Sequence, residues 1–78
     1  MITFRQIKPN LARVYVGELE IVFSYDTPVA ATLPDGRRVC TNRYFSATTK
    51  RHVKAAGYAD AEAIDHDELT CLINGETP

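Results

Sequence analysis

The sequence predicts an α+β fold: an antiparallel β-meander of four to five strands, followed by two short C-terminal helices packed on one face of the sheet. Residues 19–25 alternate as a strand does, with Leu19, Ile21, Phe23 and Tyr25 on one face and Glu20, Val22 and Ser24 on the other. Turn-forming residues divide the first 41 residues into strand-length segments. Helix start and stop signals follow from residue 46 onward. The 78 residues are enough for one small domain, residues 1–78.

The first two strands are expected at Ile2–Ile7 and Leu11–Val16. Lys8-Pro9-Asn10 separates them as a turn, because proline presets one central dihedral and asparagine tolerates the next. The facing of the first strand stays open, since Phe4 and Ile7 differ in parity and fall on opposite faces.

The next turn sets a register. Gly17-Glu18 is a two-residue hairpin loop with glycine at the first central position, as a type II′ turn requires. The strand that starts at Leu19 then pairs Val14 with Ile21, and Arg13 with Val22. One face is uniformly apolar and the other is mixed, so we expect the apolar Val14/Ile21 face to lie beneath the C-terminal helices.

A second hairpin follows an interruption at Asp26-Thr27-Pro28, where proline has no N–H for the ladder. Its strands are expected at Val29–Leu33 and Arg37–Thr41. Pro34-Asp35-Gly36 between them suits a type I turn closed by a left-handed glycine. This turn predicts the hairpin and leaves its register open.

Two helices complete the predicted domain. The first runs from about Ala47 to Ala56, after a Ser or Thr cap, and stops at Gly57. The second starts at the cap Asp65, has an acidic first turn that suits the helix dipole, and ends before Gly75. The buried faces are expected to comprise Thr49, Val53 and Ala56 in the first helix and Leu69, Leu72 and Ile73 in the second.

Composition indicates a soluble, cytoplasmic protein. Apolar runs reach three residues, whereas a membrane span needs about 20. Residues 1–6 lack the apolar core of an export signal. Cys40 and Cys71 are expected as small buried side chains, and a disulfide across the core is the alternative.

Charge is unevenly distributed although the net charge is −1. Residues 36–59 contain no acid, and their bases form a candidate basic surface: Arg37, Arg38, Arg43, Lys50, Arg51 and Lys54. Residues 60–78 contain no Lys or Arg, and most of their acids form a candidate acidic surface: Asp60, Glu62, Asp65, Asp67 and Glu68. Either these surfaces bind partners, or they pair with each other at about 0–1 kcal/mol per exposed pair.

Some residues suggest chemistry, but each has a structural explanation. Asp65-His66-Asp67-Glu68 lacks the i, i+4 histidine spacing of a helical metal site, and a helix start explains its acids. Ser24 has no base that the sequence can place, and His52 is expected to be exposed or half buried. A zinc site would have to draw on Cys40, His52, His66 and Cys71, which include no closely spaced pair. We predict no catalytic residue, metal site or cofactor.

Two stretches resemble a family of short uncharacterised proteins of bacteriophages, prophages and plasmids. The first, FSYDTPVA at residues 23–30, matches an S-Y-x-T-P-V-A core. The second, RYFSATTKRH at residues 43–52, matches an aromatic-S-x-T-T-x-x-H segment, with Phe45 where many members have Trp. The resemblance covers about Leu11 to Gly57. It implies a mobile-element setting, and it carries over no activity and no catalytic residue.

We therefore expect a non-catalytic accessory protein of a phage or mobile element that binds a macromolecule. The acidic surface suits the occlusion of a host defence protein, in an anti-CRISPR-like manner, or of a nucleic-acid-handling protein, because its carboxylates imitate phosphate. One alternative is direct DNA or RNA binding through the basic surface at residues 37–54. Another is a structural or self-associating module, dimeric through a sheet edge.

Overall fold

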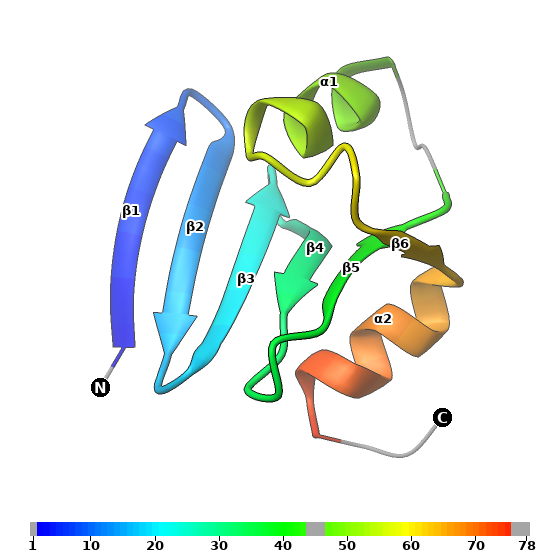
Figure 1. Cartoon of the computed structure of the whole chain (residues 1–78). Helices are drawn as coiled ribbons and strands as arrows, with labels where there is room; N and C mark the ends of the chain where they lie inside the picture. The colour runs from blue at the N-terminus through cyan, green and yellow to red at the C-terminus, as the bar shows by residue number, and fades with distance from the viewer. Residues whose placement is uncertain (1, 44–46, 76–78) are drawn as a thin grey trace.

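A computed structural model describes residues 2–43 and 47–75 (Figure 1). Its elements are β1 (Ile2–Lys8), β2 (Leu11–Val16), β3 (Leu19–Ser24), β4 (Thr27–Thr32), β5 (Arg38–Thr41), α1 (Ala47–Ala55), β6 (Glu62–Ile64) and α2 (His66–Ile73). The strands form one sheet in the order β1-β2-β3-β4-β5-β6. Neighbouring strands are antiparallel from β1 to β5, and the fold class is the predicted α+β class.

The β2–β3 hairpin has the predicted register. Val14 lies opposite Ile21 and Arg13 opposite Val22, and Gly17 has the positive φ of 60° that its turn requires. In β1 the pairing shifts between Gln6 and Lys8. This irregularity resolves the facing of β1, because it lets Ile7 pack against the buried cluster while Phe4 is 65% exposed.

The predicted interruption at residues 26–28 is a tight turn between two paired strands. Ser24 pairs with Thr27, so that Tyr25 and Asp26 form the loop. Pro28 lies inside β4, where the β3–β4 register shifts, and a missing N–H is tolerated at such a site. The second hairpin is confirmed as β4–β5, with Gly36 at a φ of 92°.

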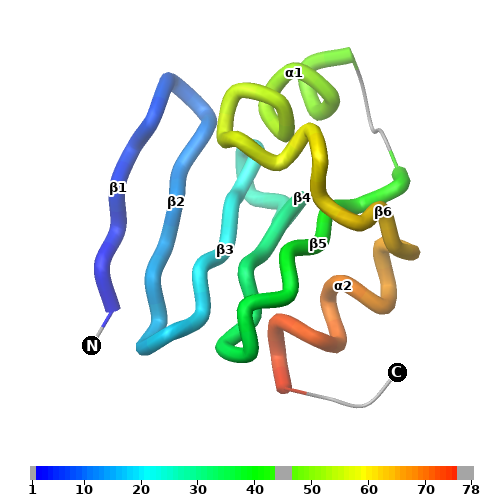
Figure 2. Tube along the Cα trace, in the orientation of Figure 1, coloured from blue at the N-terminus to red at the C-terminus, as the bar shows by residue number. Residues whose placement is uncertain are grey.

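A sixth strand was not predicted. β6 is only three residues long, Glu62–Ile64, which is too short for the sequence to show an alternating pattern. Two of its three residues are exposed. It pairs parallel to β5, with Cys40 opposite Ala63. The chain reaches this position by passing through α1, as the trace shows (Figure 2).

The predicted packing of both helices on one face is wrong. Ala30 pairs with Cys40 and the next residue, Ala31, pairs with Val39, so the two pairs point to opposite faces. The first pair belongs to a cluster with α1 residue Val53, and the second pair to a cluster with Leu69 of α2. β4 and β5 are apolar on both faces, and each face is covered by one helix.

The cover over β1–β3 also differs from the prediction. α1 lies over the mixed face, where Leu11 and Val22 are fully buried in the cluster with Val53. On the apolar face, Ile21 is buried as predicted, but Val14 is only half buried and Val16 is 41% exposed. The mixed face can be buried because its polar side chains find partners, as described below.

Both helices end as predicted. Gly57 has a φ of 88° two residues beyond α1, and Thr49, Val53 and Ala56 are buried. The expected Ser or Thr cap of α1 falls within residues 44–46, which lie outside the described residues. Asp65 caps α2 by accepting a hydrogen bond from the backbone N–H of Asp67 at 3.0 Å.

Candidate functional site

The candidate site is the apolar surface of β1–β3 on the face opposite α1, beyond the strands β4 and β5 that α2 covers. We call it the open apolar face, and its residues are Ile2, Phe4, Ala12, Val14, Val16 and Phe23. Ile2 is 73% exposed and Phe4 is 65% exposed. Exposed apolar residues that cluster in this way mark interaction surfaces more often than isolated ones do.

A groove of about 640 Å³ crosses one end of the open apolar face. Its lining residues are Phe4, Gln6, Asn10, Leu11, Ala12, Val14, Phe23, Tyr25 and Asp26. The floor is apolar, while two amides and one carboxylate lie among the lining residues. An apolar floor with a few polar groups is the usual composition of a binding site.

Tyr25 stands at this groove in an unusual backbone conformation. Its φ of 57° lies in the left-handed region, which an aromatic residue rarely adopts. Tyr25 is also 59% exposed. Its N–H donates to the carbonyl of Asn10 at 2.7 Å, and Asn10 is also left-handed, with a φ of 65°. This hydrogen bond ties the backbones of the two neighbouring turns together, and strained residues of this kind concentrate at functional sites.

Ser24 and His52 meet behind this turn. Ser24 Oγ lies 2.6 Å from His52 Nδ1, and both residues are buried, contrary to the exposed or half-buried position expected for His52. Burial lowers the pKa of His52, and the cations Lys8 and Arg51 lower it further. A lowered pKa favours the neutral imidazole. The contact joins β3 to α1.

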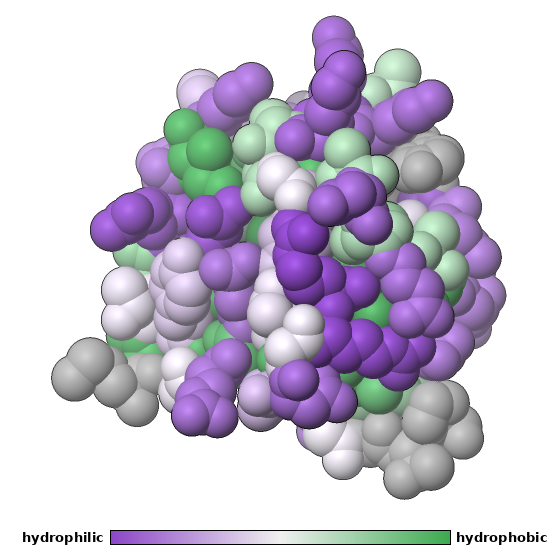
Figure 3. Space-filling model, in the orientation of Figure 1, coloured by the Kyte–Doolittle hydropathy of each residue, from purple (hydrophilic) through white to green (hydrophobic). Residues whose placement is uncertain are grey.

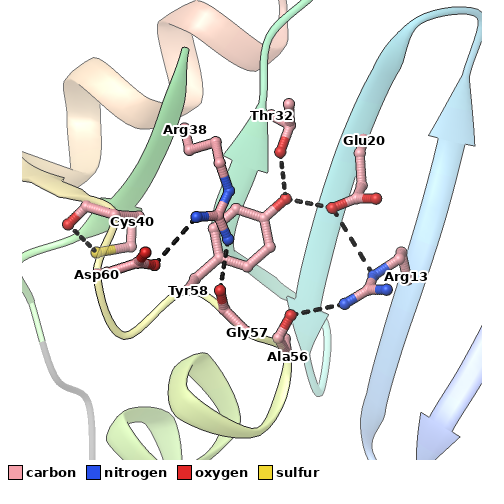
Figure 4. A network of polar contacts seen from close by, with 10 residues as sticks. Arg13, Glu20, Thr32, Arg38, Cys40, Ala56, Gly57, Tyr58 and Asp60 are labelled. Carbon is pink, nitrogen blue, oxygen red and sulfur yellow. Dashed lines mark hydrogen bonds and ion pairs between the residues drawn. The ribbon is translucent and has the colours of Figure 1, made fainter. Parts of the chain in front are cut away.

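A second polar cluster fills the mixed face beneath the segment after α1 (Figure 4). The Tyr58 hydroxyl donates a hydrogen bond to Glu20 Oε2 and lies 2.6 Å from Thr32 Oγ1. Burial, followed by the bond to Glu20, raises the pKa of Tyr58 to about 12. Arg13 donates to the Ala56 carbonyl at 2.6 Å and lies 3.8 Å from Glu20. These contacts give Glu20 a hydrogen-bond donor and pair Arg13 with a carbonyl and a carboxylate, although Arg13 Nε is buried without a hydrogen-bond partner among the described residues.

The basic and acidic surfaces touch each other. Arg37 forms a two-point pair with Glu62 at 3.1 and 3.2 Å, and this pair lowers the pKa of Glu62. Arg38 pairs with Asp60 at 3.0 Å, and its guanidinium lies 4.7 Å from the centre of the Tyr58 ring. The interpretation that the two charge blocks complement each other thus holds for these two pairs. Hydrophilic side chains dominate the face shown in Figure 3.

The remaining predicted surface residues are not members of these two pairs, although Glu68 is close enough to Arg37 to contribute to its raised pKa. On the basic surface, Lys50, Arg51 and Lys54 are exposed along α1. Arg43 follows β5, and its N–H donates to Thr41 Oγ1 at 3.1 Å. On the acidic surface, Asp65, Asp67 and Glu68 gather at the start of α2. The lysines and arginine of α1 and the carboxylates at the start of α2 thus belong to different helices on opposite faces of the sheet.

Sequence-predicted ligands and thiols are not brought together. Within residues 2–43 and 47–75, no group of three or more His, Cys, Asp or Glu could hold a metal ion. Cys40 and Cys71 are free thiols, so the alternative disulfide is not formed, and burial raises the pKa of Cys40. Neither helix in the part of the chain that the structure describes is long and apolar enough to cross a bilayer.

Sequence reasoning missed the groove and the Ser24–His52 contact. The groove could have been anticipated from the surplus of apolar residues on β1–β3, which exceeds what two short helices can cover. The Ser24–His52 contact joins residues 28 positions apart, and no local pattern predicts such a contact.

Comparisons with known proteins give one match. The model of a family of unknown function (DUF8033) matches residues 2–70. Neither the curated proteins nor the solved structures give a match.

Proposed function

The chain belongs to the DUF8033 family of unknown function, and from that premise we propose that it is a non-catalytic module that binds a protein through the open apolar face. The observation that carries this proposal is the groove of about 640 Å³ on a mostly apolar sheet surface, with Asp26 and the exposed Tyr25 at its margin. Tyrosine at the margin of an apolar surface is typical of residues that dominate protein interfaces.

The conformation of Tyr25 supports the same proposal. A left-handed φ costs an ordinary residue roughly 1–2 kcal/mol, and glycine or asparagine would fit this turn with less strain. Tyr25 contributes a ring contact to His52, with centroids 6.0 Å apart, but most of its surface stays exposed. A contact with a partner would use this exposed surface, and stability alone gives little reason for tyrosine here.

In the finer form of the proposal, the protein comes from a mobile element and occludes a host defence or nucleic-acid-handling protein. Its support is the resemblance of residues 23–30 and 43–52 to phage and plasmid proteins, together with the carboxylates Asp65, Asp67 and Glu68 at the start of α2. Asp60 and Glu62 contribute less, because each already pairs with an arginine.

Direct nucleic-acid binding is the second candidate, and α1 favours it. Lys50, Arg51 and Lys54 are exposed on a helix with no acidic residue in its first turn. Arg37 and Arg38, however, are engaged by Glu62 and Asp60, which reduces the charge available for phosphate.

Affinity capture from host lysate, with and without nuclease, tests these proposals against one another. Tyr25→Asp should abolish capture of the partner while the fold is kept, because aspartate tolerates a left-handed φ better than tyrosine does. The matched control is Lys50→Glu with Lys54→Glu, which should leave nuclease-resistant capture unchanged. Capture that survives Tyr25→Asp would disprove binding at the groove.

Two further arms separate the alternatives. Asp67→Lys with Glu68→Lys reverses the acidic surface and spares the cap Asp65; loss of capture would support the occlusion proposal, and unchanged capture would contradict it. Nucleic-acid binding predicts partners that disappear with nuclease, and a gel shift that weakens steeply as salt rises and is lost in Lys50→Glu with Lys54→Glu.

A further inference from the structure

The two edges of the sheet are unequal. β6, at one edge, is three residues long, and short edge strands offer little backbone for pairing. β1, at the other edge, is seven residues long and exposed at six of its seven positions. Because β1 pairs with β2 on one side only, the backbone N–H and C=O groups on its other side have no neighbouring strand in the described part of the chain. Its residues Ile2 and Phe4 are 73% and 65% exposed. Such an edge is a template for another strand.

We propose that β1 pairs with β1 of a second copy of this chain, antiparallel about a two-fold axis through Phe4. The inference goes beyond the proposed function, because it concerns the backbone edge of β1 and a second copy of this chain. Phe4 and Gln6 belong both to this edge and to the groove lining, so the self-association of the purified chain is what tests it.

The register follows from the geometry of β1. Its pairing with β2 is regular from Ile2 to Gln6 and shifts after Gln6. Phe4 is the centre of this regular segment of residues 2–6. An axis through Phe4 therefore pairs the whole segment with itself, and the irregularity ends the pairing at either side.

Side-chain chemistry favours the same register. With the axis at Phe4, the two Phe4 rings are neighbours, Ile2 faces Gln6, and Thr3 faces Arg5. Aromatic pairs stabilise antiparallel strands, and this register places no like charges opposite each other. An axis at Arg5 would instead face guanidinium against guanidinium. An axis at Thr3 would leave Arg5 and Gln6 without opposite residues in the other β1.

The area indicates a weak dimer. Covering the Ile2 and Phe4 side chains and five residues of backbone in each copy buries on the order of 1,000 Å² in total, which is the lower limit for a specific interface. We expect a dissociation constant in the micromolar to millimolar range.

Sedimentation of the wild-type chain up to about 1 mM should therefore show a concentration-dependent dimer. Phe4→Lys places like charges on the axis and should raise the dissociation constant at least about tenfold. The matched control is Val16→Lys, which lies on the same apolar face but on β2. It should leave the dimer intact, whereas face-to-face packing of the open apolar faces would make Val16→Lys as damaging as Phe4→Lys.

Cross-linking tests the register directly. In a Cys71→Ser background, Phe4→Cys should oxidise to a disulfide-linked dimer, because residues on the axis have Cα atoms about 4.5–5.5 Å apart. Ile2→Cys should not, because the two copies of residue 2 would be roughly 13 Å apart. A monomer throughout the concentration range, or cross-linking through residue 2 in place of residue 4, would overturn the proposal.

Discussion

At the scale of single residues, Tyr58 links the segment after α1 to two strands. Its hydroxyl reaches Glu20 on β3 and Thr32 on β4, and the residue is 1% exposed. Removing the hydroxyl leaves Glu20 with one fewer partner in a half-buried site, which costs about 1–3 kcal/mol. Tyr58 therefore stabilises the mixed face through specific contacts as well as through apolar burial.

Tyr58 should be visible in an alkaline titration. Because burial and Glu20 raise its pKa to about 12, phenolate absorbance should include a component with a midpoint near 12 that Tyr58→Phe removes. An unfolded tyrosine ionises near 10, so this group's contribution to stability is full below pH 10 and is lost as the pH rises through about 12. Titration curves that are identical in both proteins above pH 11 would contradict the assignment.

His52 should make the protein less stable in mild acid. Its pKa in the fold is lowered by burial and by Lys8 and Arg51, whereas an unfolded histidine ionises near 6.5. The unfolded state thus binds the proton more readily, and stability should fall as the pH drops below about 6.5. Urea denaturation at pH 7.5 and 5.5 measures this fall, which should be smaller in His52→Gln. An equal fall in both proteins would show that other groups cause it.

At the scale of elements, the start of α2 depends on one carboxylate. Asp65 accepts the N–H of Asp67 at 3.0 Å, so Asp65→Ala should destabilise the protein by about 1 kcal/mol and lower its melting temperature by roughly 4–8 °C. Asp67→Ala removes an acid from the same turn but no cap, and it should cost less than half as much. Equal losses would mean that charge near the helix end, rather than capping, stabilises α2.

The hairpins could be predicted because their turns are encoded locally. Gly17 and Gly36 provide the positive φ that the loops require, and the alternation of β3 then fixes the β2–β3 register. The start and end of α2 were equally predictable from Asp65 and Gly75. β6 could not be predicted, because three residues show no periodicity and its pairing with β5 depends on where α1 returns the chain.

The turn at Tyr25 shows why the candidate site escaped prediction. A two-residue hairpin loop with a positive φ is normally recognised by glycine, asparagine or aspartate at its first position, and here that position is tyrosine. The sequence therefore indicated an interruption at Pro28 where the structure has a turn at Tyr25 and Asp26. The residue that conflicts with local preference is the one that lies at the groove.

At the scale of the whole molecule, burial on β1–β3 is divided between the two faces, whereas the prediction placed it on the Val14/Ile21 face, where Ile21 is buried and Val14 only half buried. Hydrophobic pattern favours the Val14/Ile21 face, but α1 covers the face with Leu11 and Val22. Pattern alone could not reveal this, because the hydrogen-bond partners of Arg13 and Glu20 are Ala56 and Tyr58, more than 30 residues away. The pairing of Arg37 with Glu62 and of Arg38 with Asp60 likewise depends on the returning chain.

The parallel β5–β6 pair has a consequence for the order in which the chain assembles. Every contact between neighbouring strands from β1 to β5 closes a short loop, whereas β6 joins β5 only after the 20 residues between Thr41 and Glu62, α1 among them, have turned back. Closing the longer loop carries a larger entropy penalty, so this last strand and the α2 it leads into are the natural place for the protein to open first. Amide protons of β6 should accordingly exchange with solvent sooner than those of β3, which is paired on both sides.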